Sequence, residues 1–133
     1  MDRKSKWLTA VFTMILLAVA ACASQQPLVT ISPTKGEIVL AMKASDFTFE
    51  PNNIKAYRGE VIVLKIENIS NTGHNFSLID PRGNMVQNIT LPPKETLTVK
   101  VALSETGTYE FYCDKPFHST LGMKGQIVVI QGP

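Results

Sequence analysis

Three side chains that bind soft metals follow one another at regular intervals near the C-terminus. Cys113, His118 and Met123 are spaced five residues apart, and Pro116 and Gly122 lie between them. Proline and glycine favour a loop, and a tight loop can bring all three side chains to one point. A thiolate, an imidazole and a thioether form a soft ligand set that selects copper. We therefore predict a copper site on this loop.

His74 is the candidate for a fourth ligand. The chain contains two histidines and two cysteines, and a second imidazole beside Cys113 and His118 would complete a trigonal set around copper. Taken singly, each residue has an ordinary explanation: a surface histidine, a small buried cysteine, a methionine that fills the core. Their combination in one exported β-domain favours the metal site.

The elements that must position these ligands are predicted to be strands. Residues 96–103 alternate in polarity, with Leu97, Val99 and Val101 on one face and polar side chains on the other. Further strands are predicted at residues 62–67, 109–113 and 126–130. Turn formers separate them at residues 58–59, 80–84, 92–93 and 105–107. This pattern predicts an all-β, two-sheet sandwich of about seven or eight strands.

The N-terminal residues are typical of an export signal. A short basic segment precedes an apolar run that is too short for an ordinary spanning helix. Val19-Ala20-Ala21-Cys22 resembles the lipobox of bacterial lipoproteins, which predicts lipidation of Cys22. The alternatives are an ordinary cleavage site that leaves Cys22 as a free thiol, or a permanent membrane anchor.

Three segments follow from this interpretation. We predict a lipoprotein signal peptide at residues 1–21, a lipidated N-terminus and flexible tether at 22–36, and a copper-binding domain at 37–133. The signal carries three of the 13 basic and one of the 11 acidic residues, so the mature chain is formally neutral. It has no basic stripe, which argues against nucleic-acid binding. A disulfide is not expected, because Cys22 and Cys113 lie at opposite ends of the mature chain.

The sequence FYCDKPFHSTLGMKG at residues 111–125 resembles the copper loop of the cupredoxins, the blue-copper family that includes azurin, auracyanin and plastocyanin. GHNF at residues 73–76 is similar to the segment that carries the first histidine ligand in azurin. The resemblance covers about residues 38–130 and implies a Greek-key β-sandwich or barrel. Phe117 departs from close relatives, which commonly have glycine before the second histidine.

This resemblance assigns roles within the site. It implies that His74, Cys113 and His118 are the equatorial ligands of one copper ion and that Met123 is the long axial ligand. Asn75 matches the position whose backbone donates to the cysteine sulfur and whose side chain ties the two ligand loops together. An ordinary turn asparagine is the alternative for that residue. Gly73 matches the glycine whose carbonyl lies on the opposite axis in azurin.

The implied function is electron transfer between Cu(I) and Cu(II), without a catalytic residue or a small-molecule substrate. Partners would be transient redox proteins such as cytochromes or oxidases, and the protein would be a monomer, held by lipid on the periplasmic or cell-surface face of a bacterial membrane. Pro116, Phe117 and Leu121 either form an apolar docking patch or close the end of the barrel.

Three other functions are alternatives to electron transfer. Copper delivery or storage uses similar ligands but usually more methionines and a more exposed site. A binuclear copper centre needs a second cysteine in the loop, and this loop has one. Thiol catalysis gives no role to Met123, and copper oxidase or nitrite reductase chemistry needs further histidines. A metal-free adhesive sandwich is the remaining interpretation.

Overall fold

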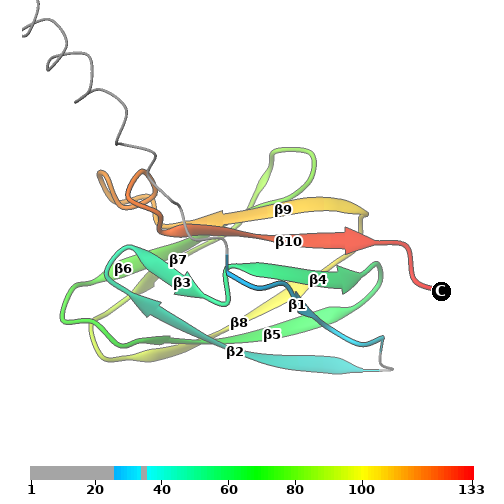
Figure 1. The fold of residues 1–133 in the computed structure, drawn as a ribbon, viewed down its shortest axis with the longest axis horizontal. Coiled ribbons are helices and arrows are strands. Elements are labelled where there is room, and N and C mark those ends of the chain that lie inside the picture. The colour runs from blue at the N-terminus through cyan, green and yellow to red at the C-terminus, as the bar shows by residue number, and fades with distance from the viewer. Residues whose placement is uncertain (1–25, 34–35) are drawn as a thin grey trace, which may run out of the picture.

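A computed structural model describes residues 26–33 and 36–133, and this part of the chain folds as two packed β-sheets without a helix (Figure 1). The strands are β1 (Val29–Thr30), β2 (Glu37–Ser45), β3 (Thr48–Glu50), β4 (Asn53–Tyr57), β5 (Val61–Asn68), β6 (His74–Ile79), β7 (Met85–Leu91), β8 (Thr96–Ala102), β9 (Gly107–Tyr112) and β10 (Lys124–Ile130). The all-β sandwich predicted from sequence is confirmed. It has more strands than the seven or eight expected. Two of them, β1 and β3, are only two and three residues long, and strands this short show no alternating pattern in the sequence.

The two sheets mix parallel and antiparallel neighbours. The larger sheet has the order β1-β4-β10-β9-β6-β7, and the smaller has the order β3-β2-β5-β8. Neighbours such as β2 and β5 or β4 and β10 run parallel and are distant in sequence. Most of the sandwich therefore depends on long-range pairing, which closes only when the whole domain folds.

The core lies between the sheets and follows the alternation of the strands. In β8, Val99 and Val101 are buried while Thr98 and Lys100, which alternate with them, are exposed. Phe49, Phe76 and Phe111 form a cluster of fully buried rings, with centroids 5.4–5.8 Å apart. Rings at this distance interact favourably beyond their area of burial. This cluster joins β3, β6 and β9 beneath the predicted ligands.

Strand pairing brings the predicted ligands to one end of the sandwich. β6 begins at His74 and pairs antiparallel with β9, with Ser77 opposite Tyr112. The start of β6 therefore lies beside the chain that leaves β9. That chain is the loop of residues 113–123, drawn in orange at the left of Figure 1, and it returns as β10. The loop carries the other three predicted ligands.

Gly125 allows this return to pack closely. A Cβ atom on Gly125 would lie 2.4 Å from the Asn52 carbonyl oxygen and 2.4 Å from the Phe111 ring. No side chain fits at that distance, so β10 approaches β4 and β9 only because residue 125 has none. The glycine thus fixes the end of the ligand loop against the aromatic cluster.

The start of the described chain differs from the tether that the sequence predicts at 22–36. Val29 and Thr30 form β1, which pairs in parallel with Ile54 and Lys55 of β4. Ile31 is buried and Val29 is partly buried, with the exposed Thr30 between them. This alternation indicates a strand, but the turn formers on either side hide it in the sequence. The predicted signal peptide and Cys22 lie outside the described residues. Within residues 26–33 and 36–133, no helix has the length and apolarity needed to cross a membrane.

Candidate metal centre

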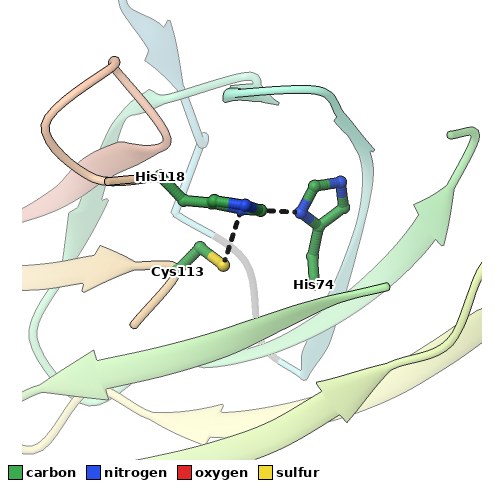
Figure 2. Close-up of side chains that lie close together, drawn as sticks. All are labelled: His74, Cys113 and His118. Carbon is green, nitrogen blue, oxygen red and sulfur yellow. Dashed lines mark hydrogen bonds between the residues drawn. The ribbon is translucent and has the colours of Figure 1, made fainter. Parts of the chain in front are cut away.

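Three of the predicted ligand atoms converge in the structure (Figure 2). The Nδ1 atoms of His74 and His118 lie 3.2 Å apart, and the Cys113 sulfur lies 3.5 Å from Nδ1 of His118. The ligand atoms of all three residues lie within 4.8 Å of one another. In a zinc site, histidine nitrogen and cysteine sulfur lie at about 2.0 and 2.3 Å from the ion. Two ligand atoms of one such ion are therefore about 3 to 4 Å apart. The three residues therefore fit a single ion.

Backbone hydrogen bonds connect Met123 to Cys113 and His118. Its carbonyl accepts a hydrogen bond of 3.0 Å from the Cys113 amide, and its amide donates to the His118 carbonyl over 2.9 Å. The side chain of Met123 is fully buried. These two bonds fold the loop back on itself, so the spacing of five residues brings Cys113, His118 and Met123 to the same end of the sandwich.

Asn75 links the two segments that carry the ligands. Its side-chain oxygen accepts a hydrogen bond of 2.7 Å from the amide of Asp114, the residue after Cys113. Its amide nitrogen donates to the hydroxyl of Ser77 over 3.1 Å. Because Asn75 is buried, these bonds are protected from competing water. The start of β6 is thereby held to the loop.

The Gly73 carbonyl has a partner in the ligand loop. The ammonium group of Lys115 donates a hydrogen bond to this oxygen. A Cβ atom on Gly73 would lie 3.3 Å from the same nitrogen. Lys115 therefore crosses from the ligand loop to the segment before His74, a role that the sequence did not indicate. The carbonyl is paired with a cation of the protein itself.

The rim of the site is apolar and partly exposed. Phe117 and Leu121 are 77% and 59% exposed, whereas the His118 side chain beside them is half-buried. Phe47, from the turn between β2 and β3, meets the His118 ring edge-on with centroids 5.2 Å apart. The sequence pattern does not indicate Phe47, because this residue is distant in sequence from the loop and only the packing of the sheets brings it there.

Burial and charge both act on His74. Burial is the main reason that the pKa of His74 lies below the ordinary histidine value, and the charges of His118 and Lys115 lower this pKa further. The Asp46 carboxylate opposes them and raises the pKa. The net effect favours the neutral imidazole, which is the form that binds a metal.

Comparison with known proteins identifies the family. The model of the cupredoxin-like domain matches residues 9–129. The chain belongs to the cupredoxin-like domain family. This cupredoxin is 33% identical over 101 residues to the plastocyanin of Solanum crispum, a match that covers 70% of this chain and 98% of that protein. It is 34% identical over 103 residues to the major plastocyanin isoform of Arabidopsis thaliana, where the match covers 70% of this chain and 58% of that one.

Solved structures share the fold of this cupredoxin. Auracyanin from Roseiflexus castenholzii has a TM-score of 0.62 at 18% identity, over 72% of this chain and 99% of that one. The metal-binding domain of the Cu(I)-exporting ATPase CopA from Streptococcus pneumoniae has a TM-score of 0.57 at 17% identity. This match covers 79% of this chain and 97% of that one. At these identities the likeness concerns the fold alone.

Family, relatives and site agree. The cupredoxin-like match, the plastocyanin relatives and the His-Cys-His group together support one copper ion in a type 1 site and a role in electron transfer. The prediction of a cupredoxin from the sequence is confirmed.

We expect the metal-free protein to lose stability as the pH falls through about 6.5, the pKa of histidine in an unfolded chain. Because the pKa of His74 is lower in the folded protein, the unfolded chain takes up this proton first. The contribution of neutral His74 is complete above that pH and is lost below it. The measurement is the urea midpoint of the metal-free wild type and of His74→Gln between about pH 8 and about pH 5. Equal pH dependence in both proteins would contradict the expectation.

Proposed function

We propose that this cupredoxin carries single electrons through one copper ion held by His74, Cys113 and His118, with Met123 as the axial ligand. The observation that carries this proposal is the convergence of two Nδ1 atoms and the Cys113 sulfur within 4.8 Å. A bound copper ion would supply the change between Cu(I) and Cu(II). The protein supplies a ligand geometry that changes little between the two states.

Rigidity of the ligand set supports this proposal. His74, Cys113 and Met123 are fully buried, and Asn75 and the backbone bonds of Met123 cross-link their segments. Groups held in this way keep their positions when the charge at the site changes, so an electron transfer requires little reorganisation. Cys113 would bind as the thiolate, and its proton would be released on metal binding.

The half-buried edge of His118 is the proposed point of electron exit. Four exposed apolar side chains lie on the same loop or against the His118 ring: Phe47, Pro116, Phe117 and Leu121. A small apolar surface of this kind suits short-lived contact with redox proteins such as cytochromes or oxidases. We propose that the protein acts as a monomer and exchanges partners at this surface.

Copper delivery or storage is the second candidate function. It is the less favoured one, because three of the four proposed ligands are fully buried, whereas a site that hands over its metal needs access. A multicopper oxidase shares the fold with a TM-score of 0.57 at 15% identity, but the match covers 42% of that protein. Oxidase chemistry uses further copper sites, and both histidines of this chain already belong to the proposed site. We therefore propose a carrier rather than an enzyme.

Copper binding tests the function directly. Cu(II) added to the folded protein is expected to give an intense visible absorption from thiolate-to-copper charge transfer and narrow copper hyperfine splitting in the paramagnetic resonance spectrum. Cys113→Ser should abolish the absorption, because it removes the thiolate. Cys22→Ser is the matched control and should keep the colour. Retention of the colour in Cys113→Ser would disprove the ligand assignment.

Replacement of the axial ligand is expected to change the reduction potential. Met123→Gln should keep the blue absorption and lower the potential, because an amide oxygen favours Cu(II) more than a thioether does. The control is Met85→Gln, since Met85 is 49% exposed on β7. Voltammetry of both variants measures the effect. A potential equal to that of the control would rule out Met123 as the axial ligand.

We also propose that the protein is exported by the signal at residues 1–21, lipidated at Cys22 and anchored to the periplasmic or cell-surface face of a bacterial membrane. The support is the sequence Val19-Ala20-Ala21-Cys22 after an apolar run. In a bacterial host that processes lipoproteins, the wild type is expected to incorporate labelled fatty acid and to sediment with membranes. Cys22→Ser should do neither. An unlabelled wild type would exclude the lipid anchor.

A further inference from the structure

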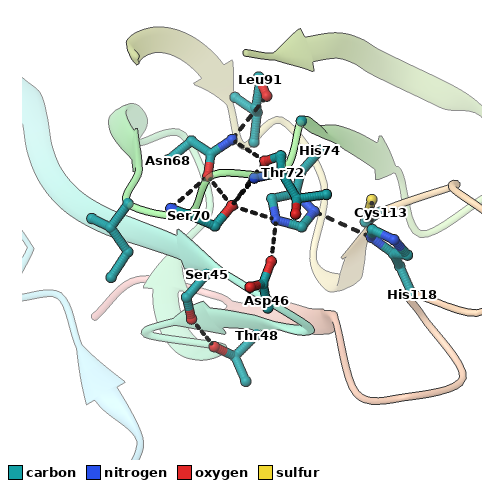
Figure 3. A network of polar contacts seen from close by, with 12 residues as sticks. Ser45, Asp46, Thr48, Asn68, Ser70, Thr72, His74, Leu91, Cys113 and His118 are labelled. Atoms are coloured by element: carbon teal, nitrogen blue, oxygen red, sulfur yellow. Dashed lines mark hydrogen bonds and ion pairs between the residues drawn. The ribbon is translucent and has the colours of Figure 1, made fainter. Parts of the chain in front are cut away.

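The second ring nitrogen of His74 has two protein partners on the side away from Cys113 (Figure 3). Nε2 lies 3.0 Å from the Ser70 hydroxyl oxygen and 3.5 Å from a carboxylate oxygen of Asp46. The His74 side chain is fully buried, whereas the Asp46 side chain is 60% exposed. A carboxylate at the surface is thus in contact with a residue in the centre of the site.

The Ser70 hydroxyl acts as an acceptor toward His74. Its oxygen lies 2.8 Å from the side-chain oxygen of Asn68 and 2.8 Å from the Thr72 carbonyl. Both of these atoms can only accept, and the hydroxyl has a single proton to give. Both oxygens lie closer to the hydroxyl oxygen than Nε2 does, at 2.8 Å against 3.0 Å, so we assign the proton to one of them and none is left for Nε2. It must accept the hydrogen bond from His74 instead.

The orientation of Asn68 secures this assignment. Its amide nitrogen lies within 3.0 Å of three carbonyl oxygens, those of Thr72, Leu91 and Pro92. Only the NH₂ group can pair with carbonyls, so the oxygen of this fully buried side chain must face Ser70. Asn68 therefore presents an acceptor, and not a donor, to the Ser70 hydroxyl.

Asp46 leads to the same proton position. Its carboxylate has no proton to donate when ionised, so it too requires a proton on Nε2 of His74. Asp46 lies in the turn between β2 and β3, where the hydroxyls of Ser45 and Thr48 are 2.6 Å apart. The next residue, Phe47, packs against His118. One turn of the smaller sheet therefore contacts both histidines of the site.

We propose that Asp46 and Ser70 are positioning residues that hold the proton of His74 on Nε2 and leave the Nδ1 lone pair directed at the metal. The second partner of a ligating histidine fixes its tautomer and increases its basicity. The negative charge of Asp46 also stabilises Cu(II) relative to Cu(I), so it lowers the reduction potential. This inference rests on the proposed role of His74 as a ligand.

The tautomer is tested in metal-free protein, so that copper chemistry does not enter the result. Nitrogen-15 NMR of the histidine side chains at about pH 8, where histidine is neutral, is expected to show the His74 proton on Nε2. Ser70→Ala should increase the fraction with the proton on Nδ1 and speed the loss of copper to a chelator. A wild-type proton on Nδ1, or an unchanged tautomer ratio in Ser70→Ala, would overturn the role of Ser70.

The charge of Asp46 is tested through the reduction potential. Asp46→Asn keeps an acceptor oxygen and removes the charge, and its exposed position makes loss of folding improbable as a confounding effect. The potential should rise more than in Glu67→Gln, a control that removes an equal charge from an exposed residue of β5. Equal shifts would overturn the role of Asp46. If no blue copper site forms, the proposed function fails, while the tautomer ratios of the metal-free wild type, Ser70→Ala and Asp46→Ala still decide whether Asp46 and Ser70 position His74.

Discussion

The pairing of β6 with β9 is the interaction on which the metal site depends. It sets Ser77 opposite Tyr112, and this register brings the start of β6 beside the loop after β9. A shift of one residue would turn every side chain of β6 to the other face of the sheet. His74 would then leave the site. The fully buried side chains of Phe76 and Leu78 hold the register, because a shift would move them out of the apolar core and put the polar side chains of Asn75 and Ser77 in their place.

Buried polar side chains hold the ligand segments in place after the strands have paired. Asn75 joins β6 to the loop, and Asn68 and Ser70 extend a buried chain of hydrogen bonds to His74. Buried polar groups of this kind are costly unless they are paired, and when paired they favour a single arrangement. The site is thus surrounded by side chains whose hydrogen bonds allow few alternatives. Such preorganisation suits a centre that changes charge without moving.

The predictions from sequence succeeded where local pattern carries the information. Alternating polarity predicted the strand at 96–103, and β8 occupies Thr96–Ala102. The spacing of Cys113, His118 and Met123 predicted the ligand loop. By contrast, β1 was read as part of a tether, because its two residues form a strand only through pairing with β4. A strand this short has no pattern of its own.

The amino-acid sequence by itself determined the chemistry: one thiol, two imidazoles and a thioether in a spacing that suits copper, on a chain that alternates as β-strands do. Tertiary structure alone decided what surrounds them. Phe47 meets His118, Asp46 meets His74 and Lys115 meets the Gly73 carbonyl, each across a long separation in sequence. These contacts arise from the packing of one sheet on the other and the return of the loop. Sequence spacing does not encode them, because they depend on distances that exist only after the strands have paired.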